Sequence, residues 1–180
     1  GATTFVDVIA TAPAFPAGGD GSVADPYRIA TVADLNNVRA VPSAHYILTN
    51  NIDLVEYGNW NPIGSSSIKF TGTFDGAGHT IDNLTIASSS SHQGLFGYVS
   101  GSTIISNVTL VNASVTTTAS GSVYAGTLVG QGDGGSTIRN ISVRDSTVAV
   151  TGNYAGGIAG SIITVSSSSF TGDVTGDQRL

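Results

Sequence analysis

The residues of this chain that could do acid–base chemistry are its twelve carboxylates and its three histidines. Polysaccharide-cleaving enzymes need two or three carboxylates, or a carboxylate-bound calcium ion with a basic residue, within about 5–10 Å of one another. When the repeated segments of the chain are aligned, neither Asp82 nor Asp145 coincides with another carboxylate on an adjacent segment, so we predict no catalytic residue. Loops could still bring acids such as Asp75 together, which keeps a polysaccharide lyase or hydrolase open as an alternative.

Residues that could bind a metal ion are scattered along the chain. It has no Cys, and its histidines, His45, His79 and His92, match no metal-binding spacing. The Asp-Gly pairs at residues 75–76 and 133–134 lack the dense Asp and Asn alternation of calcium-binding loops, and tight turns explain them. We therefore predict that the protein holds no metal ion and no cofactor.

The composition points away from nucleic acid and membrane partners. The 180 residues carry a net charge of -6, and no run of basic residues is present that could bind phosphate groups. No apolar run approaches the roughly 20 residues that a membrane-spanning helix needs. A chain rich in Ser, Thr and Gly, with 10% charged residues, is typical of extracellular proteins. We therefore expect an extracellular or cell-surface location without membrane insertion.

Three segments of the chain repeat one pattern, in which two glycines flank apolar residues and a turn leads to the motif apolar-x-Asn-apolar-x-apolar. The segments begin at Gly94, Gly126 and Gly157, and the second half of the pattern also occurs at residues 81–86. The Asn of this motif, called the Asn station, is found at Asn83, Asn107 and Asn140, with Ser167 in the last segment.

The unequal spacing of these stations predicts a solenoid, because each coil of a solenoid contacts only its neighbours and tolerates insertions at its turns. Within the motif, apolar residues alternate with polar ones, as in short strands that bury one face. We therefore predict an all-β fold, a right-handed parallel β-helix, in which Ile81, Ile105 and Ile138 stack above one another. Residues 71–180 would form its repeats.

The Asn station has two possible roles. Stacked asparagines could form an internal ladder in which side-chain amides bond from coil to coil. Alternatively, each Asn could carry a glycan in a eukaryotic or archaeal secretory pathway, because each begins an Asn-x-Ser/Thr sequon. We favour the ladder, since a buried Asn cannot do both. The possible glycosylation sites are Asn83, Asn107, Asn112 and Asn140.

A single helix is expected, at about residues 31–40. Thr31 and Asp34 have the spacing of a capping box, and apolar residues follow at helical intervals. An open end of a solenoid exposes strand edges and core, so we expect this helix and the rest of residues 18–70 to cap the first coil. Trp60 would be buried in this cap.

Residues 1–17 form a separate N-terminal arm. Its apolar, β-prone run ends at prolines and has no counterpart in the repeats. The run could pack as a strand on its own β-helix, or another copy could accept it at a sheet edge, which would build a filament. The residues of this possible assembly strand are Phe5, Val6, Val8 and Ile9.

The repeats contain cores of the form Gly-Leu-hydrophobic-Gly, at residues 94–97 and more loosely at 127–130 and 157–160. Together with the leader-like segment 70–81, these cores resemble the GLUG-repeat surface proteins of bacteria and archaea. The resemblance covers roughly residues 18–176. It implies a right-handed parallel β-helix on a secreted or cell-surface protein, often as one module of a large adhesin or stalk, and it implies no shared catalytic motif.

The predicted function is that of a non-enzymatic extracellular structural module, a stalk or filament subunit that assembles by stacking or strand addition. Its partners would be copies of itself or further repeats of a longer chain, with surface glycans as another candidate. A glycan-binding adhesin module is therefore an alternative, and it rests on the hydroxyl-rich loops at residues 88–91 and 116–122. Ice binding would need a regular two-column Thr face, which the aligned segments do not show.

Overall fold

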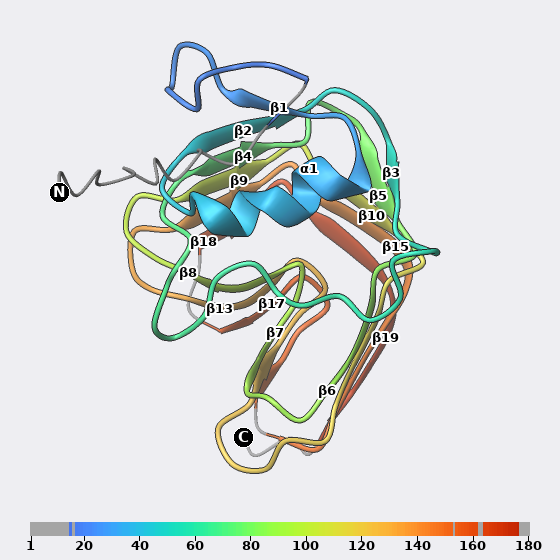
Figure 1. The fold of residues 1–180 in the computed structure, drawn as a ribbon. Helices are drawn as coiled ribbons and strands as arrows, with labels where there is room; N and C mark the ends of the chain where they lie inside the picture. The colour runs from blue at the N-terminus through green and yellow to red at the C-terminus, as the bar shows by residue number, and fades with distance from the viewer. Residues whose placement is uncertain (1–14, 16, 153, 162–163, 177–180) are drawn as a thin grey trace, which may run out of the picture.

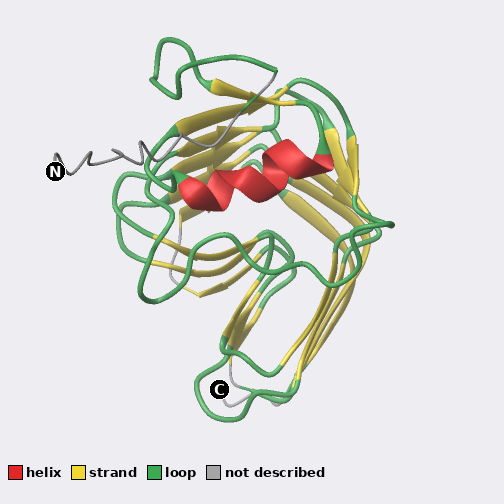
Figure 2. Cartoon of the chain, in the orientation of Figure 1, coloured by secondary structure: helices red, strands yellow, loops and turns green. Residues whose placement is uncertain are grey.

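The chain winds into a parallel β-solenoid. The computed structural model describes residues 15, 17–152, 154–161 and 164–176. Within these residues the coil makes about four turns (Figure 1). Strands form its walls and one short helix crosses its N-terminal end (Figure 2). The predicted fold class, an all-β parallel β-helix with one short capping helix, is confirmed.

In the described part of the chain, four parallel sheets form the walls. The first contains, in spatial order, β1 (Tyr27–Ile29), β2 (His45–Leu48), β4 (Thr73–Asp75), β9 (Ile104–Ser106), β14 (Thr137–Arg139) and β18 (Thr164–Ser166). The second contains β3 (Ile52–Asp53), β5 (Thr80–Asp82), β10 (Thr109–Val111), β15 (Ser142–Val150), β11 (Ser114–Thr117) and β6 (Thr85–Ser88), and β19 (Ser169–Thr175) also pairs with β15. The third contains β16 (Tyr154–Ala155), β12 (Tyr124–Ala125) and β7 (His92–Gln93), and the fourth β17 (Ala159–Ser161), β13 (Val129–Gly132) and β8 (Phe96–Val99).

Apolar side chains of each coil stack on those of the next and fill the interior. Phe74, Ile105 and Ile138 are direct partners in neighbouring strands of the first sheet, and each is at most 1% exposed. Burying an aliphatic or aromatic side chain of this size contributes about 1.5–3 kcal/mol. Since the columns run through successive coils, the coils stabilise one another.

The predicted stacking of Ile81 on Ile105 is wrong. Ile81 pairs with Leu110 in the second sheet, whereas Ile105 lies in the first. The coils bend twice in succession, and in residues 105–115 the motif apolar-x-Asn-apolar-x-apolar occurs at both bends. Residues 81–86 match the second occurrence, at residues 110–115, because they pair with that strand.

Two columns of residues in the left-handed conformation form these bends. The left-handed conformation costs Asn less free energy than it costs most residues, because the short Asn side chain can hydrogen-bond locally. The single Asn station predicted from the sequence is therefore two stations. The first column holds Asn107 (φ 56°), Asn140 (φ 54°) and Ser167 (φ 48°), and the second holds Asn83 (φ 59°), Asn112 (φ 55°) and Asp145 (φ 53°).

Side-chain amides join the coils along the first column. Asn107 Nδ2 donates to Asp75 Oδ1 at 2.9 Å, and Asn140 Nδ2 donates to Asn107 Oδ1 at 3.0 Å. The ladder begins on a carboxylate, which accepts hydrogen bonds without needing to donate one. Each rung therefore has its donor and its acceptor matched.

A second ladder runs along the other column. Asn83 Nδ2 donates to Asp53 Oδ1 at 2.7 Å, and Asn112 Nδ2 donates to Asn83 Oδ1 at 2.6 Å. Asn112 and Asn140 are exposed, so the ladders lie on the outside of the coil, and the expectation of an internal ladder is wrong. The bends turn these side chains outward while their apolar neighbours point inward. Glycosylation of the four asparagines stays a prediction.

The helix α1 (Val32–Asn37) continues into a 3₁₀ turn (Val38–Ala40) and crosses the N-terminal end of the coils (Figure 1). Thr31 Oγ1 accepts a hydrogen bond from Asp34 N at 3.1 Å, and Asp34 Oδ2 accepts one from Thr31 N at 3.0 Å. This is the capping box expected from the sequence. Trp60, also expected to be buried in this region, is 1% exposed.

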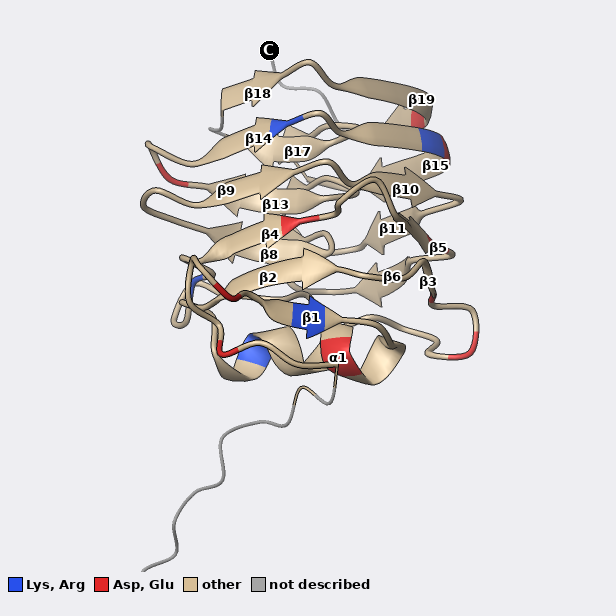
Figure 3. Cartoon of the chain, turned by 90° about the horizontal axis from the view of Figure 1, so that it is seen from above, with Lys and Arg blue, Asp and Glu red and all other residues tan. Residues whose placement is uncertain are grey.

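The two ends of the solenoid differ (Figure 3). At the N-terminal end, β1 and β2 of the segment 18–70 extend the sheet that the later coils form. At the other end, Val165 of β18 is 44% exposed, whereas its partner Ile138 is 1% exposed. The last described coil therefore presents apolar side chains that equivalent positions of earlier coils bury. The four residues expected to form an assembly strand, Phe5, Val6, Val8 and Ile9, lie outside the described residues.

The glycines of the repeats form a sharp corner between β7 and β8 and between the equivalent strands of later coils. A Cβ atom on Gly94 would lie 2.8 Å from Gly126 O, and one on Gly130 would lie 2.7 Å from both Gln93 N and Gly97 O. These contacts are with backbone atoms of neighbouring strands, which cannot move aside without disturbing the sheets. The glycines are therefore required by the close approach of the backbones.

We predict that Gly130→Ala destabilises the fold by about 1–3 kcal/mol or more, because the added methyl group has no space. Gly134→Ala is the matched control, since a Cβ there would meet no atom within 4 Å, and we expect it to change stability by less than about 0.5 kcal/mol. Urea unfolding followed by circular dichroism measures both. Equal stability of the two variants would contradict this account of the corner.

Candidate functional site

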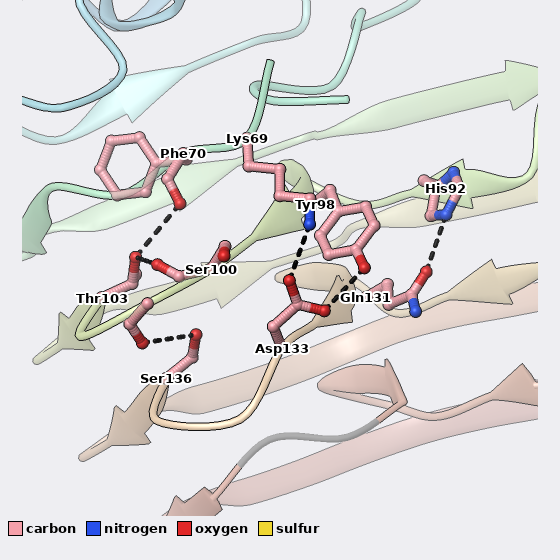
Figure 4. Close-up of polar contacts among 10 residues, drawn as sticks. Lys69, Phe70, His92, Tyr98, Ser100, Thr103, Gln131, Asp133 and Ser136 are labelled. Carbon is pink, nitrogen blue, oxygen red and sulfur yellow. Dashed lines mark hydrogen bonds and ion pairs between the residues drawn. The ribbon is translucent and has the colours of Figure 1, made fainter. Parts of the chain in front are cut away.

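Side chains from both sides of the glycine corner meet on the outside of the coil. The rings of His92 in β7 and Tyr98 in β8 are stacked with their centroids 5.2 Å apart. His92 Nε2 donates to Gln131 Oε1 of the next coil at 2.8 Å. Figure 4 shows these residues together with Lys69 and Asp133. We call these five residues the corner cluster.

Asp133 is held by two donors of the corner cluster. Lys69 Nζ lies 2.8 Å from Asp133 Oδ2, and the Tyr98 hydroxyl donates to Asp133 Oδ1 at 2.7 Å. The contact with Lys69, followed by that with Tyr98, lowers the pKa of the Asp133 carboxyl. The same carboxylate raises the pKa of Lys69 and of Tyr98. A carboxylate that stays ionised with both oxygens bonded is suited to joining the loop of Lys69 to β13, and not to donating a proton.

Aromatic rings continue from the corner cluster along the solenoid. His92, Tyr124 and Tyr154 are strand partners, and their rings stack at centroid distances of 5.5 and 4.7 Å. Such pairs contribute about 0.5–1.5 kcal/mol beyond their buried area. His92 and Tyr124 each stack on two rings, whereas Tyr154 at the end of the column stacks on one and is 44% exposed. We interpret the column as a second contact that joins the coils.

A cavity of about 500 Å³ lies beside the corner cluster, between the end of the 3₁₀ turn, the loop at residues 61–68 and the turn at residues 88–93. Its volume falls in the range of about 300–1,000 Å³ that is common for small-molecule sites. Burial lowers the pKa of Arg39, which lines it. Polar residues make up most of the lining, among them Arg39, Ser65, Ser90, Ser91, His92 and Gln93.

The hydroxyl-rich loops expected to bind glycans have different surroundings. Ser88, Ser90 and Ser91 of the first loop line the cavity. In the second, at residues 116–122, Thr117 is part of β11, is 1% exposed and donates to Ser90 O at 3.2 Å. The prediction of an exposed loop is therefore wrong at Thr117, because the alternation of the strand turns it inward.

The carboxylates also stack differently from the sequence alignment. Asp82 is the partner of Val111 and not of Ser106, which is opposite Asp75. Asp82 is also the strand partner of Asp53, so the expectation that no carboxylate stacks on another carboxylate in an adjacent coil is wrong. The misplaced register of residues 81–86 explains the first error, and the second arose because residues 52–53 were not among the aligned repeats.

Asp75, Asp82 and Asp145, the acids that would carry an enzymatic alternative, lie at separate places in the fold. Asp75 is in the first sheet, Asp82 is in the second, and Asp145 lies at a bend within β15. Asp75 Oδ1 accepts from Asn107 Nδ2 and from Ala77 N, so it serves the first ladder and its turn. Within the described residues, no group of three or more His, Asp or Glu side chains could hold a metal ion.

No family model matches the chain, so the resemblance to GLUG-repeat proteins stays a prediction. The chain is 35% identical over 158 residues to halomucin of Haloquadratum walsbyi, an alignment that covers 80% of this chain and 2% of that protein. It is 33% identical over 135 residues to a protein of Evansella cellulosilytica described as a Gly-rich membrane protein, covering 71% of this chain and 15% of that one. The chain thus matches a small part of each relative.

A solved structure shares the fold. The crystal structure of a Bacteroides ovatus protein described as an immunoglobulin A1 protease aligns with a TM-score of 0.58 and 21% identity. The alignment covers 88% of this chain and 69% of that one. At this identity the likeness shows the fold alone. In the described part of the present chain, no helix has the length and apolar character needed to cross a membrane.

We predict that Asp133→Asn lowers stability at neutral pH by less than about 1 kcal/mol, because the two side chains are 33% and 38% exposed and solvent screens the ion pair. The folded-state pKa of Asp133 is lower than its usual value of 3.8, so its contribution is present above that value and is lost as the pH falls through the folded-state pKa. The difference from the wild type, measured by thermal unfolding from pH 7 downward, should therefore shrink once the pH falls below 3.8. Glu56→Gln, at an exposed turn, is the control and should show no such difference. If the loss of stability caused by Asp133→Asn grew as the pH fell, this assignment of the Asp133 contacts would be contradicted.

Proposed function

We propose that this chain is a non-enzymatic structural module of a larger extracellular or cell-surface protein, in which coils of the same kind continue the solenoid. The observation that carries the proposal is an exposed apolar side chain on the last described coil. Val165 is 44% exposed at a position where Ile105 and Ile138 are buried by the coil above. A further coil of the same repeat would bury this position in the same way.

The comparisons support this proposal. The similar segments make up 2% and 15% of the two relatives, so related sequences occur within much longer chains. Their names, halomucin and Gly-rich membrane protein, fit an extracellular structural or adhesin-like role at the cell surface. The acidic, hydroxyl-rich composition fits the same location.

The site geometry favours a structural role over an enzymatic one. In the corner cluster, Asp133 uses both carboxylate oxygens to hold Lys69 and Tyr98. Asp53 and Asp75 accept the first hydrogen bonds of the two amide ladders. These acids join segments of the fold, and joining segments is what a rigid spacer requires. The similarity to a protein described as a protease concerns the fold and carries no residue of a reaction to this chain.

Duplication of one coil tests the stacking part of this proposal. A second copy of residues 122–151, inserted between Thr151 and Gly152, adds 30 residues, which is the spacing of the paired residues Tyr124 and Tyr154. The stability of a solenoid is approximately a sum over coils and their interfaces, so the longer chain should fold with unchanged or higher stability and a larger denaturant m-value. A Gly/Ser insert of equal length is the control and should raise neither.

The location is tested separately. Antibodies raised against the purified chain should label intact cells that produce the parent protein, without permeabilisation. Loss of folding in the duplicated chain would contradict the stacking, and labelling that needs permeabilisation would contradict the surface location.

A further inference from the structure

The amide ladders on the outside of the coil use one of the two hydrogens on each Asn Nδ2 atom. Asn83 Nδ2 donates to Asp53 Oδ1 in the coil before it, and Asn83 Oδ1 accepts from Asn112 Nδ2 in the coil after it. The donor and the acceptor of Asn83 therefore point in opposite directions along the solenoid. In a planar amide, only the hydrogen trans to the oxygen points away from the oxygen in this manner. The hydrogen cis to the oxygen takes no part in the ladder.

Asn112 and Asn140 are the last asparagines of the two ladders. They donate to the Asn of the preceding coil at 2.6 and 3.0 Å. The next stations hold Asp145 and Ser167, which have no amide group to stack on them. Asn112 and Asn140 are exposed, whereas the two asparagines to which they donate are partly buried. The second N–H group of each exposed amide makes no hydrogen bond within the described residues.

Each of these two exposed asparagines begins an Asn-x-Ser sequence, which is an acceptor sequence for N-linked glycosylation. The serines, Ser114 at the start of β11 and Ser142 at the start of β15, are partly exposed, and the residue after each is buried. Neither serine Oγ atom makes a hydrogen bond within the described residues. The amide and the hydroxyl that this modification requires are therefore both outside the core.

We propose that Asn112 and Asn140 are N-glycosylation sites, and that each side chain keeps its place in the ladder when it carries a glycan. In the transfer, Nδ2 loses its unused hydrogen as a proton and bonds to the anomeric carbon of a sugar, whose bond to a lipid-linked phosphate breaks. The product is a secondary amide, in which the trans arrangement is favoured. This arrangement leaves the remaining hydrogen trans to the oxygen, which is the hydrogen that the ladder uses.

The ladder and the glycan are compatible because the asparagines lie on the outside of the coil. Successive strands are about 4.8 Å apart, which leaves too little room for branched glycans on two successive stations. Asn83 and Asn107 would therefore stay unmodified. The proposal goes beyond the structural role and rests on the extracellular location proposed above, since this modification accompanies export.

Secretion of the whole chain from yeast, followed by mass spectrometry of its peptides, tests the proposal. An endoglycosidase trims each N-linked glycan to one N-acetylglucosamine, which marks the modified Asn. We expect this mark at Asn112 and Asn140 of the secreted protein, and not at Asn83 or Asn107. The yeast pathway exports the chain through an added signal peptide, so the test does not depend on where the parent protein resides.

Substitutions at the hydroxyl residues remove each acceptor sequence and keep the Asn. Ser114→Ala should abolish the glycan on Asn112 alone, and Ser142→Ala should abolish the other, without loss of folding, because neither hydroxyl is bonded. Thr85→Ala and Thr109→Ala are the matched controls, since they remove the acceptor sequences of the two partly buried asparagines. The controls should leave the mass of the glycoprotein unchanged apart from the substitution itself.

Two ways of removing the glycan test whether the ladder is kept. The endoglycosidase leaves a glycosylated amide, which still has its N–H group. An amidase that releases the whole glycan converts Asn to Asp, which is ionised at neutral pH and has no hydrogen to donate to the preceding Asn. We expect the amidase-treated protein to melt at a lower temperature than the trimmed protein, and the trimmed protein to melt with the unglycosylated double variant Ser114→Ala/Ser142→Ala.

The proposal is overturned if Asn112 and Asn140 of the secreted protein are unmodified, or if Asn83 and Asn107 carry glycans as often. Equal melting temperatures of the amidase-treated and trimmed proteins would contradict the retention of the ladder. These results are independent of the coil duplication and of the antibody labelling, so a failure here is distinguishable from a failure of the proposed function.

Discussion

Each coil must bend its backbone at the same positions as the coil beneath it, and the rest of the structure depends on this shared register. In a parallel sheet each strand residue has one partner on each neighbouring strand, so a bend displaced by one residue would turn the inward side chains outward. Left-handed Asn residues at both bends and glycines at the corner meet this requirement. The amide ladders on Asp53 and Asp75 connect the bends from coil to coil, and the apolar columns follow from the alignment that results.

The positions of the corner cluster and of the cavity reflect the register between coils. The corner cluster lies where the coils are in register, and the cavity lies where that register ends. Because of the shared register, His92, Tyr124 and Tyr154 stack and Asp133 meets Lys69 and Tyr98. The cavity lies at the N-terminal end, where the 3₁₀ turn and the loop at residues 61–68 replace a full coil. Irregular segments do not fill space as a repeating coil does, and this leaves buried atoms of Arg39 and Gln93 without a hydrogen-bond partner among the described residues.

Much of this architecture could be predicted from the sequence, because it depends on local patterns. The capping box at Thr31 and Asp34 and the burial of Trp60 follow from short-range signals, and the parallel β-solenoid follows from the repetition of one motif along the chain. The pairing of residues 81–86 could not be predicted, because the same motif occurs at both bends of residues 105–115 and sequence similarity does not distinguish them. Nor could the cavity, since Arg39 and Gln93 are far apart in the chain and are brought together by the capping of the first coil.

Cross-linking of engineered cysteine pairs tests the register most directly, because the natural chain has no Cys. The structure pairs Thr85 with Ser114, whereas the sequence alignment pairs Thr85 with Thr109. Adjacent strands are about 4.8 Å apart, so a short thiol-reactive cross-linker should join Thr85→Cys to Ser114→Cys rapidly in the folded protein and should not join Thr85→Cys to Thr109→Cys. Efficient linkage of the second pair in place of the first would contradict the stacking described for this solenoid.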